Sequence, residues 1–174
     1  MIVESVRTAA TALLGLYAGG VFFTVITPSV GRMPPSAYVP YWQALNTDHG
    51  RAMPPFLLAC LVLLIATAVL SYGRGRPVFI LSVIAALLVI ATIVLTVSQL
   101  EPLNRVADTW SADRPPANWA AERDRWITLH TVRTVAAVLA FASLLIAKAV
   151  DRPSVPSAQA AASASRTQAG QEVA

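Results

Sequence analysis

The residues with the clearest chemical potential recur along one helical face near the start of the last apolar segment. Trp119, Trp126 and Arg133 are spaced seven apart, and His130 falls four residues after Trp126 and three before Arg133. At about 100° per residue, this spacing puts all four side chains on one side of an α-helix. Such a face offers two indole rings beside a titratable base and a fixed cation, a combination suited to a flat phenolic or polycyclic ligand.

Polar and aromatic side chains also gather in two stretches that precede this face. The stretch from residue 28 to 53 contains a run of them: Tyr38, Tyr41, Trp42, Gln43, Asn46, Asp48 and His49. The stretch from residue 101 to 125 contains several charges together with Glu101, Asn104 and Trp110. We expect both stretches to be loops on the same side of the protein. The first is expected to include a short amphipathic helix over residues 37–45, at an interface that favours aromatic residues.

Several of these residues also have a purely structural interpretation. Trp110 and Trp119 are typical of aromatic anchors at a membrane interface. Arg133 can pair with Glu101 or with a backbone carbonyl, because a buried charge needs a partner. His130 can equally be a structural histidine with satisfied hydrogen bonds.

Two further alternatives concern residues in other segments. Tyr17 and Thr96, inside apolar segments, can line a cavity or form ordinary interhelical hydrogen bonds. His49, His130 and Glu101 contain the ligand types of a two-histidine, one-carboxylate iron site. The three come from different segments, however, and no local spacing supports such a site.

The composition places these residues in a membrane protein. Hydrophobic residues make up 56% of the chain and charged residues only 13%, with a mean hydropathy of +0.60, whereas a soluble domain carries roughly a quarter charged residues. The net charge of +4 is spread along the chain and forms no basic tract of the kind that binds nucleic acid. Cys60 is the single cysteine, which excludes a disulfide framework.

The chain is predicted to be all-α, an integral membrane four-helix bundle with two non-cytoplasmic loops. A spanning helix needs about 20 mainly apolar residues, and four segments qualify, at about residues 8–28, 54–72, 77–99 and 127–149. Pro54 and Pro55 suit the start of the second span, because the first N–H groups of a helix have no partner there. These spans form one transmembrane domain over residues 1–150. The Ala- and Ser-rich residues 151–174 are expected to be a disordered tail.

The fourth span is unusually short between its flanking charges. Only residues 134 to 147 lie between Arg133 and Lys148, about 21 Å of helix at the standard rise. Lys148 can extend outward at its end. The other end is therefore expected to draw Arg133 and His130 below the interface, where ionisable groups usually face a protein interior or a cavity.

The orientation is predicted from the charges at the helix ends. The link at residues 73–76 is Gly-Arg-Gly-Arg, and Lys148 and Arg152 follow the fourth span. The positive-inside tendency assigns these to the cytoplasm. We therefore expect a multi-pass protein of the cell membrane with both termini cytoplasmic, although the opposite stretches also contain arginines, interspersed with acids.

Three short motifs occur in a fixed order relative to these spans. Trp-Gln-Ala-Leu-Asn occupies residues 42–46, Pro-Leu-Asn residues 102–104, and Trp-x-x-x-His-x-x-Arg-Thr residues 126–134. In this order the sequence resembles the small four-helix membrane proteins grouped with the fungal anthrone oxygenases, a family whose bacterial members are largely of unknown function. The similarity covers residues 8 to 150.

The resemblance implies oxidation of an anthrone to an anthraquinone by molecular oxygen, with no established requirement for a bound cofactor. An anthrone is a flat carbon acid whose anion can reduce oxygen directly. The roles implied are His130 as the general base and Arg133 as the stabiliser of the enolate oxygen. The residues implied in substrate binding are Asn104 as a hydrogen-bond donor, Trp126 and Trp119 as aromatic walls, and Glu101, Trp42 and Asn46.

Two functions from different classes remain open at this point. The first is a membrane monooxygenase of this type acting on a lipophilic aromatic, anthrone- or phenol-like, small molecule. The second is a non-catalytic membrane protein that binds a lipid or partner helices, and homo-oligomerisation is compatible with either. An enzyme requires His130 and Arg133 to converge on a cavity, whereas a structural protein requires them to be paired off in a filled interior.

Overall fold

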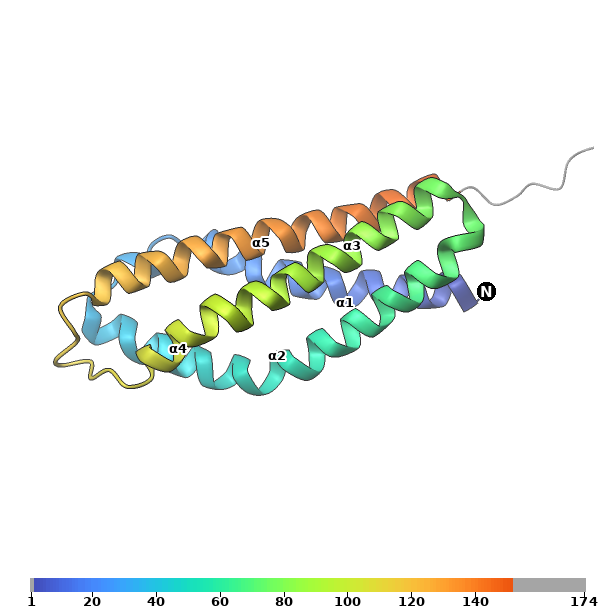
Figure 1. The fold of residues 1–174 in the computed structure, drawn as a ribbon. Helices are drawn as coiled ribbons and strands as arrows, with labels where there is room; N and C mark the ends of the chain where they lie inside the picture. Colours follow the sequence, from blue (N-terminus) through green and yellow to red (C-terminus); the bar gives the residue numbers. More distant parts are fainter. Residues whose placement is uncertain (1, 152–174) are drawn as a thin grey trace, which may run out of the picture.

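The computed structural model describes residues 2–151, and these contain helices and no strand (Figure 1). The predicted all-α class is confirmed. The helices are α1 Ile2–Val25, α2 Pro35–Ser71, α3 Arg76–Leu95, α4 Glu101–Ala107 and α5 Trp119–Val150. The predicted tail lies outside the described residues from residue 152 onward, and Asp151, expected to begin it, is ion-paired to the bundle.

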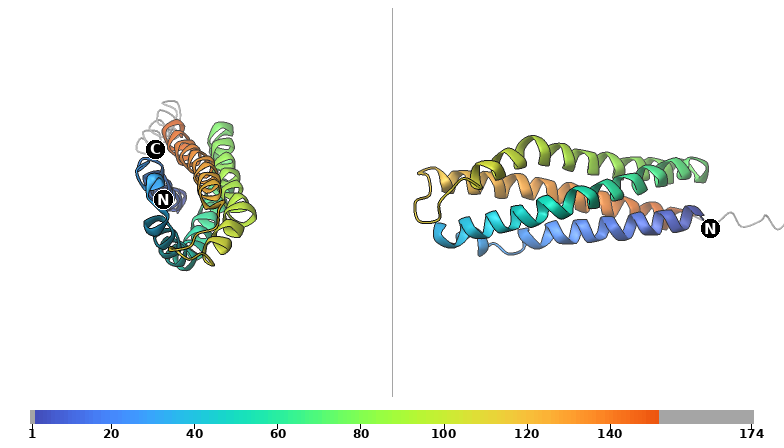
Figure 2. Two further views of the ribbon diagram at one scale, coloured as in Figure 1. Left: turned by 90° about the vertical axis from the view of Figure 1, so that its left-hand side faces the viewer. Right: turned by 90° about the horizontal axis from the view of Figure 1, so that it is seen from below.

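The long helices form an antiparallel bundle in which each lies beside two others (Figure 2). Helix α5 packs against α1 and α3, and α2 packs against the same two helices from the opposite side. Four helices, including α3 with its extension through α4, are long and apolar enough to cross a membrane. Large apolar side chains such as Leu16, Leu58 and Val97 are exposed on the outside of the bundle, as the lipid-facing surface of a multi-pass membrane protein requires.

Small residues let the helices approach closely in the half of the bundle that contains both described chain ends. Ala10, Ala85, Ala137 and Ala140 are fully buried there. A Cβ atom added to Gly15 would come within 3.1 Å of the Phe141 ring. Because lipid tails are as apolar as the helices, such close packing is a main source of helix association in a membrane.

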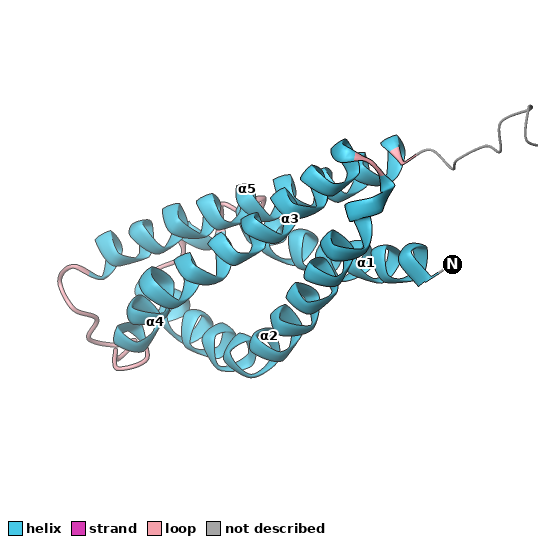
Figure 3. Ribbon diagram, turned by 45° about the vertical axis from the view of Figure 1, so that its right-hand side comes forward, coloured by secondary structure: helices cyan, strands magenta, loops and turns pink. Residues whose placement is uncertain are grey.

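The first predicted loop is mostly helical, so the predicted helix start at Pro54 is wrong. Helix α2 begins at Pro35 and continues through Pro40, Pro54 and Pro55. An interior proline removes a backbone hydrogen bond and bends a helix, and α2 is bent along its length (Figure 3). Membrane helices tolerate interior prolines when neighbouring groups satisfy the freed backbone. Pro54 and Pro55 therefore lie inside α2 and do not mark its start.

The third span is extended rather than ended near residue 99. A π-helical turn over Thr96–Leu100 joins α3 to α4. Pro102 has no N–H to continue the regular pattern, and π-turns insert an extra residue into a helix, frequently at functional sites. The turn places Thr96 and Glu101 in the lining of a cavity between the helices.

Candidate active site

His130 is held in one orientation by groups on two helices. Its ring stacks on that of Trp126 at 4.9 Å and 15°, four residues earlier on α5. Its Nε2 lies 3.0 Å from the carbonyl oxygen of Val21 on α1, which also accepts a hydrogen bond from Thr134. The side chain is only 4% exposed. Helical spacing and the contact with α1 therefore fix this imidazole inside the bundle.

Arg133 completes the histidine's hydrogen bonding. Its Nη2 lies 2.7 Å from His130 Nδ1, and its Nη1 donates to Thr96 Oγ1 at 3.3 Å. A guanidinium can only donate hydrogen bonds, so Nδ1 must be the accepting nitrogen of a neutral imidazole. The other nitrogen, Nε2, then carries the proton and donates it to the carbonyl of Val21.

The positive charge of Arg133 has no carboxylate partner among residues 2–151. Glu101, the partner considered from sequence, pairs instead with Arg105 at 3.2 Å. In addition, Arg133 Nε is buried without a hydrogen-bond partner. A partly buried cation that lacks both an anion and a full set of acceptors is costly, and a site with this character favours an anionic ligand.

Asn104 joins two indole rings beside this pair. Its Oδ1 accepts a hydrogen bond from Trp42 Nε1 at 3.0 Å and another from Trp126 Nε1 at 2.9 Å. The resemblance implied that Asn104 would be a donor, and the structure shows its oxygen acting as an acceptor from the protein. Its amide Nδ2 forms no hydrogen bond within the described residues, so this is the group that remains for a ligand.

The residues of the two predicted loops come together around these indoles. Trp42 lies edge-on to Trp110, with ring centres 5.5 Å apart. Gln43 Nε2 donates to the carbonyls of Ala107 and Trp110 at the end of α4. These contacts tie the start of α2 to α4 and to the segment that follows, and they hold Asn104 and the indoles in place.

A cavity of about 680 Å³ lies in front of this arrangement, between all of the long helices. Its volume is within the range of small-molecule sites. Six of the eight residues proposed from sequence line it: Asn46, Glu101, Asn104, Trp126, His130 and Arg133.

The other two proposed residues do not line this cavity. Trp42 is buried behind Trp126, with ring centres 5.7 Å apart. Trp119 instead contacts Tyr38 and carries the guanidinium of Arg123 over its ring at 5.0 Å. It is the first residue of α5, about two turns before Trp126, so sharing a helical face with His130 was not sufficient to reach the cavity.

The cavity reaches the outer surface of the bundle between helices. Leu16, Leu58 and Val97 are in its lining, and they are 68%, 63% and 66% exposed. These three side chains lie in the apolar stretches of α1, α2 and the α3 extension. The opening therefore faces the region that lipid occupies around a spanning bundle.

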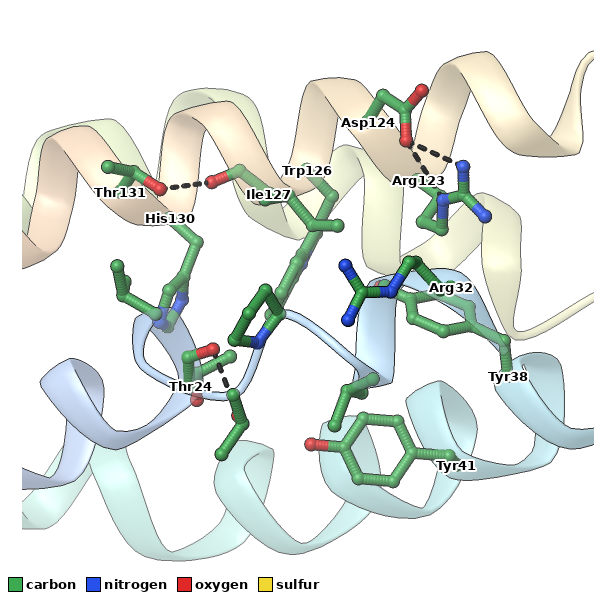
Figure 4. A pocket seen from close by; sticks show the side chains of 15 residues that line it. Thr24, Arg32, Tyr38, Tyr41, Arg123, Asp124, Trp126, Ile127, His130 and Thr131 are labelled. Carbon is green, nitrogen blue, oxygen red and sulfur yellow. Dashed lines mark hydrogen bonds and ion pairs between the residues drawn. The ribbon is translucent and has the colours of Figure 1, made fainter. Parts of the chain in front are cut away.

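A smaller cavity of about 330 Å³ lies on another side of the Trp126–His130 stack (Figure 4). Arg32, Tyr41 and Arg123 are in its lining, and Trp126 and His130 line both cavities. The stacked pair is thus a wall shared by the two spaces. Three charged residues, Arg32, Arg123 and Asp124, line the smaller cavity.

The iron-site alternative finds no support in the geometry. His49 and Glu101 line the larger cavity together with His130. Nevertheless, the described part of the chain contains no group of three histidine, cysteine, aspartate or glutamate residues placed to hold a metal ion.

One of three comparisons with known proteins gave a match. A family model described as anthrone oxygenase matches residues 42–143, more than half of the chain. No curated protein and no solved structure gave a match. The matched residues run from Trp42 through α4 and include His130 and Arg133 of α5, while α1 lies outside them. The chain belongs to the anthrone oxygenase family.

Proposed function

We propose that this protein oxidises a lipophilic aromatic substrate of the anthrone or phenol class with molecular oxygen. One observation carries the proposal. The guanidinium of Arg133, which has no carboxylate partner in the described residues, is hydrogen-bonded to His130 on the wall of a cavity that opens toward lipid. Membership of the family supplies the reaction class.

In this proposal the substrate is held by its shape and by its oxygen. The apolar lining and the indole of Trp126 provide flat contact area for a polycyclic ring system. The carbonyl oxygen of the substrate points toward Arg133. When the ring methylene loses a proton, negative charge develops on that oxygen, and a fixed cation in a water-poor site stabilises it strongly.

His130 is the proposed base, and one of its hydrogen bonds must break before it can accept a proton. Its Nδ1 lone pair is engaged by Arg133 Nη2, so it can accept a proton only after the guanidinium turns to the substrate oxygen. Binding of that oxygen therefore both stabilises the enolate and frees the base. The Val21 carbonyl, which accepts from Nε2, would then stabilise the imidazolium, much as a third group orients a catalytic histidine.

The overall reaction balances without a further reductant. The methylene carbon of the anthrone loses two hydrogens and gains one oxygen atom, while the second oxygen atom leaves as water. The enolate supplies the electrons that reduce oxygen, so the protein contributes deprotonation, orientation and exclusion of water. These are tasks that His130, Arg133 and the apolar cavity can perform.

The decisive experiment measures wild-type chemistry directly. Purified protein in lipid nanodiscs is given 1,8-dihydroxyanthrone, and oxygen uptake is followed together with quinone formation. The proposal expects protein-dependent consumption of one oxygen molecule per quinone, above the spontaneous rate in empty nanodiscs. With ¹⁸O₂, one labelled atom should appear in the new carbonyl. A rate equal to that of empty nanodiscs for anthrones and phenols alike would reject the oxidase function.

Non-catalytic lipid binding is the second candidate, because the larger cavity opens between exposed leucine and valine side chains. It predicts that a lipid copurifies in stoichiometric amount and that oxygen uptake stays at background. The same nanodisc preparation, extracted and analysed for bound lipid, separates the two functions.

The proposed orientation places the site end of the bundle on the non-cytoplasmic side and both termini in the cytoplasm. A cysteine introduced at Gly73, in the link between α2 and α3, should resist labelling by an impermeant maleimide in intact cells. A cysteine at Ala112, in the segment between α4 and α5, should label. The reverse pattern would invert the orientation and leave the four helices unchanged.

A further inference from the structure

Two buried donor atoms have no hydrogen-bond partner within the described residues, and both belong to residues that line the larger cavity. They are the hydroxyl Oη of Tyr17 on α1 and Nε of Arg133 on α5. Tyr17 is 4% exposed. Buried polar groups are almost always hydrogen-bonded in native proteins, and an unsatisfied one carries the full cost of its desolvation. Because both residues line a cavity, a ligand held there can supply the missing partner.

The packing of α1 against α5 puts these two side chains at one level of the bundle. The helices run antiparallel, and Val21 on α1 contacts His130 on α5 through the hydrogen bond described above. Tyr17 lies one turn before Val21, and Arg133 lies one turn after His130, so both are displaced in the same direction along the bundle.

The chemistry of the two groups selects the kind of atom that fits between them. A guanidinium N–H donates only, and a phenol can donate its hydrogen. The charge of Arg133 is not neutralised by any carboxylate among residues 2–151. An oxygen atom that carries negative charge can accept a hydrogen bond from each of the two donors and can neutralise the guanidinium. On a flat apolar molecule, that oxygen is a ketone becoming an enolate, or a phenolate.

We propose that Tyr17 Oη and Arg133 Nε together bind the oxygen of the aromatic substrate, which makes Tyr17 a substrate-binding residue. The proposal rests on the proposed function for the statement that this oxygen belongs to the reacting ketone. Binding itself does not depend on turnover. Tyr17 lies outside the residues matched by the family model, so the assignment comes from its burial, its missing partner and its place on the cavity wall.

The test uses 2-hydroxyanthraquinone, a non-reactive probe whose phenolate absorbs in the visible, and anthracene, which has the same ring system and no oxygen. Both are titrated into nanodiscs containing wild-type protein or the Tyr17→Phe variant. We expect Tyr17→Phe to weaken binding of the hydroxyanthraquinone roughly 10-fold, as for loss of one hydrogen bond to a charged group. Anthracene should bind the variant and the wild type equally.

A matched control and a stability measurement keep the test specific. Tyr72→Phe removes a hydroxyl from a tyrosine that is 78% exposed and lines neither cavity, and it should bind both probes normally. Because Tyr17→Phe deletes an unpartnered buried hydroxyl, its melting temperature should equal or exceed that of the wild type. A lowered melting temperature, or equal loss of both probes, would indicate a structural role and overturn the proposal.

The outcomes separate this proposal from the oxidase function. If no anthrone is oxidised but 2-hydroxyanthraquinone binding depends on Tyr17, the oxygen-binding site stands and the oxidase function fails. If the wild type oxidises 1,8-dihydroxyanthrone and Tyr17→Phe binds 2-hydroxyanthraquinone as tightly as the wild type, the oxidase function stands and the role of Tyr17 is wrong.

Discussion

Two arginine side chains reach into the bundle, one toward each end, and their charges are paired in different ways. Arg7, near the chain ends, is 2% exposed, and its Nη2 lies 2.8 Å from Asp151 and also pairs with Glu4. Arg133, at the other end, contacts a neutral histidine and a threonine and no carboxylate within the described residues.

The surroundings of the two arginines also differ, because the interior near Arg7 is filled and Arg133 borders a cavity. Toward Arg7 the interior is filled by alanine and leucine side chains with no exposure, among them Ala10, Leu14, Leu144 and Ala147. Arg133 borders the larger cavity. A charge that serves only to join helices is neutralised by the protein itself, as at Arg7. A charge that is left open beside an empty space indicates that the missing partner comes from outside the protein.

The largest expected effect is on catalysis at the end of the bundle that contains Arg133 and the larger cavity. His130→Ala should lower oxygen uptake by about 10²- to 10⁴-fold, the usual range for removal of a general base. His130→Gln, which can still donate to the Val21 carbonyl, should be equally impaired because an amide is not a useful base. Thr128→Ala, an exposed position on the same helix, serves as the control. Full oxidation by either His130 variant would remove the base assignment.

The next largest effect is on the thermal stability that the filled end of the bundle, around Arg7, provides. Asp151→Ala leaves the charge of Arg7 buried with only Glu4 beside it, and breaking a buried ion pair costs about 3 kcal/mol or more. Thermal unfolding in detergent should therefore occur at a clearly lower temperature, while oxygen uptake measured well below that temperature stays near wild type. An unchanged melting temperature would show that the ion pair does not stabilise the bundle, and the contrast between the two ends would be lost.

The sequence was sufficient for the fold class and for placing three cavity-lining residues on one face of α5. Four apolar segments predicted the bundle, and the 100° periodicity of α5 placed Trp126, His130 and Arg133 on one face. That prediction depends only on local geometry, which a helix fixes by itself. The shortness of the apolar stretch after Arg133 further indicated that this charge lies within the protein rather than at its surface.

Sequence reasoning did not predict the features that depend on contacts between segments far apart in the chain. The predicted helix start at Pro54 is wrong, because a proline's local preference does not show whether neighbouring helices tolerate a bend. The hydrogen bonds that Asn104 Oδ1 accepts from two indoles, on α2 and α5, join distant segments and were not predicted from the sequence. The Arg7–Asp151 pair and the unpartnered hydroxyl of Tyr17 depend on the register between α1 and its neighbours, which periodicity within one helix does not contain.

The most direct test of the difference between the two ends is Arg133→Met, measured for both melting temperature and oxygen uptake with 1,8-dihydroxyanthrone. The side chain keeps much of its length and loses its charge. The account predicts loss of protein-dependent oxidation together with a melting temperature equal to or above that of the wild type, because no internal ion pair is broken. A melting temperature lowered as far as in Asp151→Ala, with oxidation retained, would contradict it and make Arg133 a structural residue.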